Sequence, residues 1–223
     1  MCIKSLLKGM LSAVAFVAVA GFVYAHNTSS AEEMSVSLSS RSSMDPKPPV
    51  EIRAIVALEE VITRVRLYSP EDKVRTINAF LNQIPYVTDM AMWGVEDRWS
   101  MPYEFLVTGA GDSEDFAIAK FYALWVSGIA AEQMSLAVSL HPLMDEEHVV
   151  LLVNLPGSEK PLVLDSLTYD LEYLDDRPEL LLVRTLESQL FLPRMKSNRD
   201  QLLEVVIDWR MSQGQDVIAK FSM

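Results

Sequence analysis

The sequence predicts an α+β domain in which a buried central helix packs on an antiparallel sheet with flanking helices. Residues 116–126 contain one polar residue, Lys120, and a helix that is apolar on nearly every side is a buried one. Three runs rich in valine and leucine follow at 134–140, 148–154 and 160–165, bounded by turn residues as strands are. The segment 155–159, Leu-Pro-Gly-Ser-Glu, predicts a hairpin between the last two runs.

Further helices are predicted on both sides of this core. Apolar residues recur at helical spacing over residues 51–66. Ser69, followed by Pro70 and two acidic residues, predicts the start of a second helix, which runs to about residue 83 before Pro85. Near the C-terminus, residues 197–200 resemble a capping box and predict a helix that opens there and ends near Met211.

Two segments of a different kind precede the domain. Residues 1–25 carry Lys4 and Lys8, then an uncharged apolar run and a small residue at the end, which indicates a cleavable signal peptide and export from the cytoplasm. The apolar run is shorter than the ~20 residues that cross a bilayer, so we expect no stable membrane insertion after cleavage. Residues 26–50, rich in serine and proline, predict a flexible linker, and the folded domain is expected over residues 51–223.

Charge and cysteine content exclude several functions. The 223 residues include 31 acidic and 19 basic ones, a formal net charge of −12, which loss of Lys4 and Lys8 with the signal peptide makes −14. An acidic chain without a basic cluster is poorly suited to bind nucleic acid or anionic membranes. The single cysteine, Cys2, lies in the predicted signal peptide, so the mature chain is expected to have no disulfide, thiolate metal site or thiol nucleophile.

Three residues have the composition of a hydrolytic triad. Ser113 is predicted at the N-terminus of the buried helix, and the hairpin register estimated from its loop places His148 opposite Asp165 or Ser166. Ser113, His148 and Asp165 would then be a nucleophile, its base and the group that orients the base. The alternative is a structural role for each, with Ser113 as a helix N-cap and His148 as a hydrogen-bonded strand residue.

A longer motif surrounds Ser113. Residues 93–106 read WGVEDRWSMPYEFL, and residues 109–120 read GAGDSEDFAIAK. Together they resemble the signature of the bacterial transglutaminase-like cysteine proteinases, the LapG-like periplasmic enzymes that cleave large surface adhesins. Residues 148–151 and 163–167 are similar to the histidine and aspartate strands of that family, so the resemblance extends roughly over residues 74–167.

The resemblance implies a papain/transglutaminase-like fold and catalytic roles for Ser113, His148 and Asp165. The family has its nucleophilic cysteine where this chain has Ser113, an aromatic residue at Arg98 and asparagine at Ser166. A thiol ionises beside an imidazolium, whereas a serine hydroxyl does not. The serine side chain is also shorter, and a misplacement of about 1 Å can cost ~100-fold in rate. We therefore expect peptidase activity to be lost or severely weakened; the alternative is a genuine serine variant.

Four further residues of the motif are candidates for binding. Asp112 and Glu114 flank Ser113, and the resemblance implies that they bind a calcium ion needed for activity. Ca²⁺ takes carboxylate and carbonyl oxygens, and two carboxylates at a helix start supply part of that shell. The alternative is that both acids only stabilise the helix dipole. Trp93 and Trp99 either line a substrate groove or pack in the core.

Functions of different classes follow from these observations. The first is a periplasmic endopeptidase that cleaves an adhesin-like exported protein through Ser113. The second is a pseudoenzyme that binds the same protein segment without cutting it, or binds a cyclic-di-GMP-responsive membrane receptor, a partner that only the resemblance implies. The third is a purely structural domain of the cell envelope. The acidic residues between 170 and 179 are expected to form a solvated face.

Overall fold

The computed structural model describes residues 47–141, 146–187 and 190–213, which belong to one compact unit. The predicted signal peptide and residues 26–46 of the predicted linker lie outside these ranges. Within them, no helix is both long and apolar enough to cross a membrane. The longer helices are α2 (Arg53–Val65), α3 (Pro70–Leu81), α6 (Ser113–Val126) and α7 (Leu192–Ser212). Shorter ones are η2 (Val50–Ile52), α4 (Asp89–Trp93), α5 (Pro102–Thr108), η3 (Ala131–Gln133) and η4 (Leu174–Asp176).

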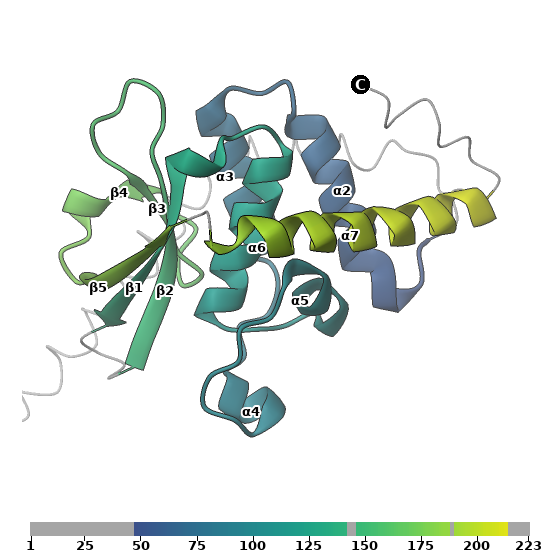
Figure 1. Cartoon of the computed structure of the whole chain (residues 1–223), viewed down its shortest axis with the longest axis horizontal. Coiled ribbons are helices and arrows are strands. Elements are labelled where there is room, and N and C mark those ends of the chain that lie inside the picture. Colours follow the sequence, from purple (N-terminus) through teal and green to yellow (C-terminus); the bar gives the residue numbers. More distant parts are fainter. Residues whose placement is uncertain (1–46, 142–145, 188–189, 214–223) are drawn as a thin grey trace, which may run out of the picture. The chain divides into compact units, whose positions relative to one another are not determined.

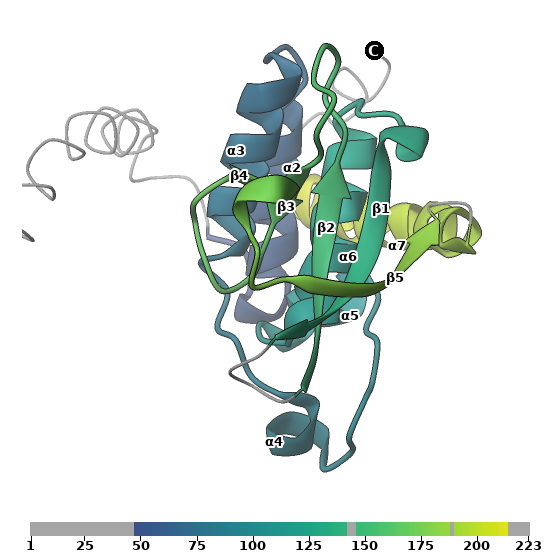
Figure 2. The same ribbon diagram turned by 90° about the vertical axis from the view of Figure 1, so that its left-hand side faces the viewer.

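An antiparallel sheet of five strands packs against α6. Its order is β4-β3-β2-β1-β5, and every neighbouring pair is antiparallel. The strands are β1 (Met134–His141), β2 (Glu146–Val153), β3 (Leu162–Leu164), β4 (Glu172–Tyr173) and β5 (Leu181–Glu187). Helix α6 lies between the sheet on one side and α2 and α3 on the other, as Figures 1 and 2 show. The predicted buried helix and three predicted strands are therefore present.

Burial on both faces of β2 explains why its sequence is apolar at successive positions. Val149 and Leu151 belong to the main core with α6, whereas Val150 and Leu152 belong to a smaller cluster that Leu180 helps to cover on the other face. A strand buried on both faces needs apolar residues in a continuous run and not in alternation. Helix α6 is buried from its first residue through Leu124, in agreement with its apolar sequence.

Helix α6 begins and ends where its sequence predicts. The N-cap residue is Asp112, and Ser113 is the first helical residue. At the other end, Gly128 has φ +102°, a left-handed conformation that favours glycine, and its N–H donates to the Trp125 carbonyl at 3.0 Å. Ser113 therefore lies at the N-terminus of a helix packed against β2.

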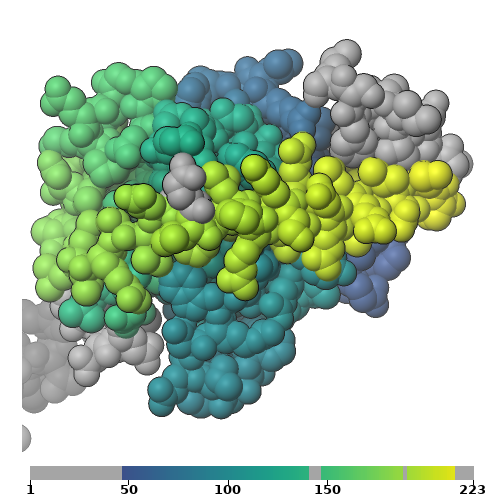
Figure 3. Space-filling model, viewed as in Figure 1, coloured from purple at the N-terminus to yellow at the C-terminus, as the bar shows by residue number. Residues whose placement is uncertain are grey.

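The C-terminal helix starts earlier than the sequence predicts. Helix α7 begins at Leu192 with Pro193 in its first turn, so the predicted capping box at 197–200 lies inside the helix and the prediction of its start is wrong. The aromatic ring of Phe191, just before the helix, stacks on Trp99 with centroids 6.3 Å apart. Asn198 of α7 accepts a hydrogen bond from the Tyr103 N–H at 2.8 Å and so caps α5. In the space-filling view, α7 lies along one face of the domain (Figure 3).

The hairpin register also differs from the prediction by one residue. Leu151 pairs with Leu164 and Leu152 with Val163. When this register is extended, His148 falls opposite Leu167, two residues beyond Asp165, so Asp165 is a diagonal neighbour of His148 and not its direct partner. β3 ends at Leu164, and Asp165 is therefore free of the ladder directly after the strand.

Ser69 and Ser197 provide a matched test of the two predicted helix starts. The Ser69 hydroxyl accepts the Asp72 N–H at 3.2 Å at the start of α3, whereas Ser197 lies exposed within α7. We expect Ser69→Ala to lower the free energy of unfolding by about 1 kcal/mol, because an orphan N–H loses its acceptor. Ser197→Ala should change it by less than about 0.5 kcal/mol. Urea unfolding measures both, and an equal loss in both variants would contradict the observed start of α7.

Candidate active site and acidic cluster

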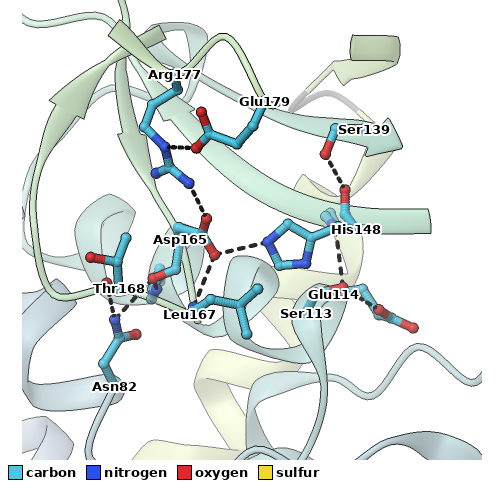
Figure 4. Close-up of polar contacts among 12 residues, drawn as sticks. Asn82, Ser113, Glu114, Ser139, His148, Asp165, Leu167, Thr168, Arg177 and Glu179 are labelled. Carbon is cyan, nitrogen blue, oxygen red and sulfur yellow. Dashed lines mark hydrogen bonds and ion pairs between the residues drawn. The ribbon is translucent and has the colours of Figure 1, made fainter. Parts of the chain in front are cut away.

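Ser113 is held by two hydrogen bonds at the start of α6. It is 2% exposed, and its Oγ accepts the Val149 N–H of β2 at 3.0 Å. The same hydroxyl donates to Glu114 Oε2 at 3.1 Å (Figure 4). The N-cap is Asp112, so Ser113 does not have the N-cap role considered as its structural alternative. A hydroxyl has one proton to donate, and the Ser113 hydroxyl donates it in the hydrogen bond to Glu114.

His148 and Asp165 form a buried pair beside Ser113. The Nε2 atom of His148 lies 2.8 Å from Asp165 Oδ1, and the two residues are 2% and 0% exposed. Figure 4 shows the imidazole between the Asp165 carboxylate and the region of Ser113. Because Nε2 contacts Asp165, a proton exchanged between His148 and a nucleophile would be carried by Nδ1. The structure thus brings together the three residues predicted as a triad.

The Asp165 carboxylate accepts hydrogen bonds at both oxygens. Oδ1 accepts the Leu167 N–H at 2.9 Å in addition to its contact with His148, and Oδ2 accepts from the Arg177 guanidinium at 2.8 Å. Burial alone would raise the pKa of Asp165, but these hydrogen bonds and the charge of His148 hold it well below its usual range. Asp165 is therefore ionised at neutral pH.

The main chain of Asp165 is held separately from its side chain. Its carbonyl oxygen accepts from Asn82 Nδ2 and from Lys120 Nζ, each at 2.9 Å. Lys120 is fully buried in α6, and burial lowers the pKa of its amine to about 7. The polar residue inside the apolar helix thus supports the turn after β3.

Three buried carboxylates gather next to Ser113. Each of Asp89, Asp112 and Glu114 offers an oxygen, and these oxygens lie within 4.8 Å of one another. Asp89 reaches the cluster because a parallel bridge joins Tyr86 to Gly111, which brings the start of α4 beside the start of α6. Asp112 Oδ2 accepts the Asp89 N–H at 3.1 Å, while Asp112 Oδ1 is buried and has no hydrogen-bond partner.

Charge repulsion and burial disfavour ionisation of these carboxylates. Burial, followed by the negative charge of Asp112, raises the pKa of Glu114 to about 8. Burial also raises the pKa of Asp112 and of Asp89, and it raises the pKa of nearby Asp115 to about 7. Ca²⁺ takes carboxylate and carbonyl oxygens as ligands, and these three carboxylates, one with an unpartnered buried oxygen, supply part of that shell. The residues present therefore fit a calcium ion.

The two tryptophans have different surroundings. Trp93 is 41% exposed, and the Arg98 guanidinium lies over its ring at 4.3 Å. Arg98 also bonds to Glu104, and its backbone N–H donates to Asp89. Trp99 is half-buried, stacks on Phe191 and packs against the main core. Trp99 therefore packs in the core, which was one of its two predicted roles, whereas Trp93 lies on the surface.

Two residues of the site were missed from sequence. Asp89 lies 23 residues before Asp112, and Arg177 lies 12 residues after Asp165 within the acidic segment. That segment is mostly exposed, as expected, but Arg177 is 8% exposed and Glu179 is half-buried against it. Arg177 is the one basic residue among five acids in residues 170–179, and this isolation is the sequence feature that could have identified it.

Comparison with known proteins identifies the family. Residues 60–186 match the family model described as bacterial transglutaminase-like cysteine proteinase BTLCP, and the chain belongs to this family. This membership confirms the resemblance in the motif around Ser113. A comparison with curated proteins finds no match.

Solved structures of LapG from Legionella pneumophila are similar to this chain. The match has 29% sequence identity and a TM-score of 0.58, and it covers 63% of this chain and 77% of LapG. A calcium-bound LapG structure matches with 28% identity and the same TM-score, and an EGTA-treated one matches with 29% identity. The likeness confirms the predicted α+β, papain/transglutaminase-like fold. Calcium is thus bound by a relative, and the cluster of Asp89, Asp112 and Glu114 can hold such an ion.

Calcium should stabilise this protein, and more strongly at higher pH. At 100 times its Kd, a ligand of the native state adds about 2.7 kcal/mol to the free energy of unfolding. With chelator present, Glu114 and Asp115 stabilise the fold only while protonated. Their raised pKa values of about 8 and 7 mean that this stabilisation is complete below about pH 4 and is lost as pH rises through 7 and 8. Thermal unfolding should therefore show falling stability from pH 5 to 8, which calcium offsets.

A matched pair of variants checks that prediction. Asp112→Asn should remove most of the calcium effect, because it takes a charged oxygen from the cluster. Glu71→Gln changes an exposed acid paired with Arg75 on α3 and should leave the calcium effect unchanged. Equal calcium stabilisation of the native protein and Asp112→Asn would contradict a site at this cluster.

Proposed function

We propose that this domain is a periplasmic member of the family that recognises an adhesin-like exported protein, with peptidase activity lost or severely weakened by Ser113. Family membership and the likeness to LapG support the type of substrate and the location. The buried pair of His148 and Asp165 supports a retained catalytic frame, by which we mean the base and the residue that orients it. The predicted signal peptide, though outside the described residues, agrees with an exported protein.

The hydrogen bond from Ser113 to Glu114 is the observation that carries this proposal. For attack on a peptide carbonyl, His148 Nδ1 must take the proton of the nucleophile. The Ser113 proton is directed to Glu114, and Oγ is occupied by the Val149 N–H as well. A thiol would lose its proton to the imidazole beforehand, whereas this hydroxyl would have to break its bond with Glu114 first.

The other groups keep their roles in such a frame. His148 would move the proton at Nδ1, and Asp165 would hold the ring through Nε2 and stabilise the imidazolium. The Ser113 N–H, at the end of a helix, is suited to receive a developing oxyanion. Asp89, Asp112 and Glu114 would hold calcium, which when bound supplies positive charge that neutralises the carboxylates at the start of α6.

A second candidate is a binding module without catalysis. The exposed Trp93, with Arg98 over its ring, offers an apolar and cationic surface next to the acidic cluster. Its ligand would be the adhesin-like segment or a cyclic-di-GMP-responsive membrane receptor, the latter by family resemblance alone. This candidate and a weakened protease differ only in whether any peptide bond is cut.

Substitutions of Ser113 test the proposed loss of peptidase activity. With calcium and an adhesin fragment, we expect no or very slow cleavage by the native protein and by Ser113→Ala. Ser113→Cys should cleave at least ~100-fold faster, because the thiolate is formed before attack and sulfur restores the reach of the side chain. Gel electrophoresis and mass spectrometry of the fragment measure the rate.

One control variant and one contrary outcome make the result decisive. Ser127→Cys places a thiol at the opposite end of α6, in a buried site, and should not cleave the fragment. Rapid cleavage by the native protein that is abolished in Ser113→Ala would overturn the proposed loss and identify a genuine serine protease.

A further inference from the structure

Arg177 makes a buried ion pair with the carboxylate that faces His148. It lies between η4 and β5, and its side chain is 9% exposed. The guanidinium donates to Asp165 Oδ2 at 2.8 Å, on the oxygen opposite the one that contacts His148. We propose that Arg177 is a positioning residue, which acts through Asp165 to fix the orientation of the His148 imidazole.

The other hydrogen bonds to Asp165 do not fix the plane of its carboxylate. Asn82 and Lys120 hold the carbonyl oxygen of Asp165, so they place the main chain but not the carboxylate. At Oδ1, the Leu167 N–H and His148 share one oxygen, about which the carboxylate can still pivot. The hydrogen bond from Arg177 at Oδ2 gives the carboxylate its second point of attachment and so fixes its plane.

Arg177 is itself fixed from the other side. Its Nε donates to Glu179, and Glu172 Oε2 lies 3.6 Å from the same nitrogen. The backbone forms a turn, with the Arg177 N–H donating to the Leu174 carbonyl and the Leu180 N–H donating to the Arg177 carbonyl, each at 3.1 Å. A planar guanidinium with fixed donors sets direction as well as charge, which a lysine ammonium does not.

This inference deepens the proposed function, since it concerns the same His148. It applies whether residue 113 carries a hydroxyl or a thiol, because Arg177 acts on the far side of Asp165 from Ser113 (Figure 4). A test that reads the hydrogen bond of His148 directly is therefore independent of cleavage.

Proton NMR of the native chain provides this test. An ordered Nε2–H bond to a carboxylate gives a strongly downfield imidazole resonance, which is assigned by its loss in His148→Gln. We expect the resonance to be sharp in the native protein, broadened or moved to the position of a free imidazole in Arg177→Met, and intermediate in Arg177→Lys. Arg75→Met, at an exposed ion pair with Glu71, should leave it unchanged.

Each outcome decides the proposal. A folded Arg177→Met, judged by thermal unfolding, with a sharp and unshifted resonance would overturn it. If Arg177→Met does not fold, Arg177→Lys decides: an intermediate resonance would support the proposal, whereas a resonance identical to the native one would overturn it, because the fixed guanidinium would then not set the orientation of the ring. Absence of cleavage by Ser113→Cys alongside a lost resonance in Arg177→Met would overturn the proposed function and support the positioning role.

Discussion

The contact between His148 Nε2 and Asp165 Oδ1 is the interaction on which the rest of this site depends. It joins the start of β2 to the turn after β3, and both side chains are buried. An unpaired carboxylate at that depth would be costly, and so the surrounding structure supplies partners to it. Arg177 and Leu167 donate hydrogen bonds to the carboxylate, and Asn82, directly after α3, and Lys120 of α6 donate to its backbone carbonyl.

The same helix α6 presents Ser113 to this pair and Glu114 to the acidic cluster. This arrangement makes the two parts of the site interdependent, because the Ser113 hydroxyl bonds to a carboxylate of the cluster. In a cysteine proteinase, the pull of an imidazolium and a helix N-terminus stores a thiolate. The same surroundings leave a hydroxyl protonated, so the proposed loss of activity rests on the single atom that distinguishes serine from cysteine at residue 113.

Much of this architecture could be predicted from local patterns, and the remainder depends on contacts distant in sequence. The apolar run of α6, the valine-rich strands and the cap at Ser69 follow from burial and hydrogen-bonding rules, and the motif around Ser113 indicated the family. The diagonal placement of Asp165 depends on a one-residue register that a loop does not set. Asp89 and Arg177 are placed at the site by the Tyr86–Gly111 bridge and by the turn at Leu174, which local sequence patterns do not predict.

The ionisation of the thiol in Ser113→Cys tests the preserved frame most directly. Its rate of alkylation by iodoacetamide would be followed against pH by peptide mass, so that Cys2 is counted separately. If His148 and Asp165 are ordered as described, the thiol should have an apparent pKa well below the ordinary ~8.5, and His148→Gln should return it towards that value. A thiol that titrates at or above ~8.5 with His148 intact would contradict the account.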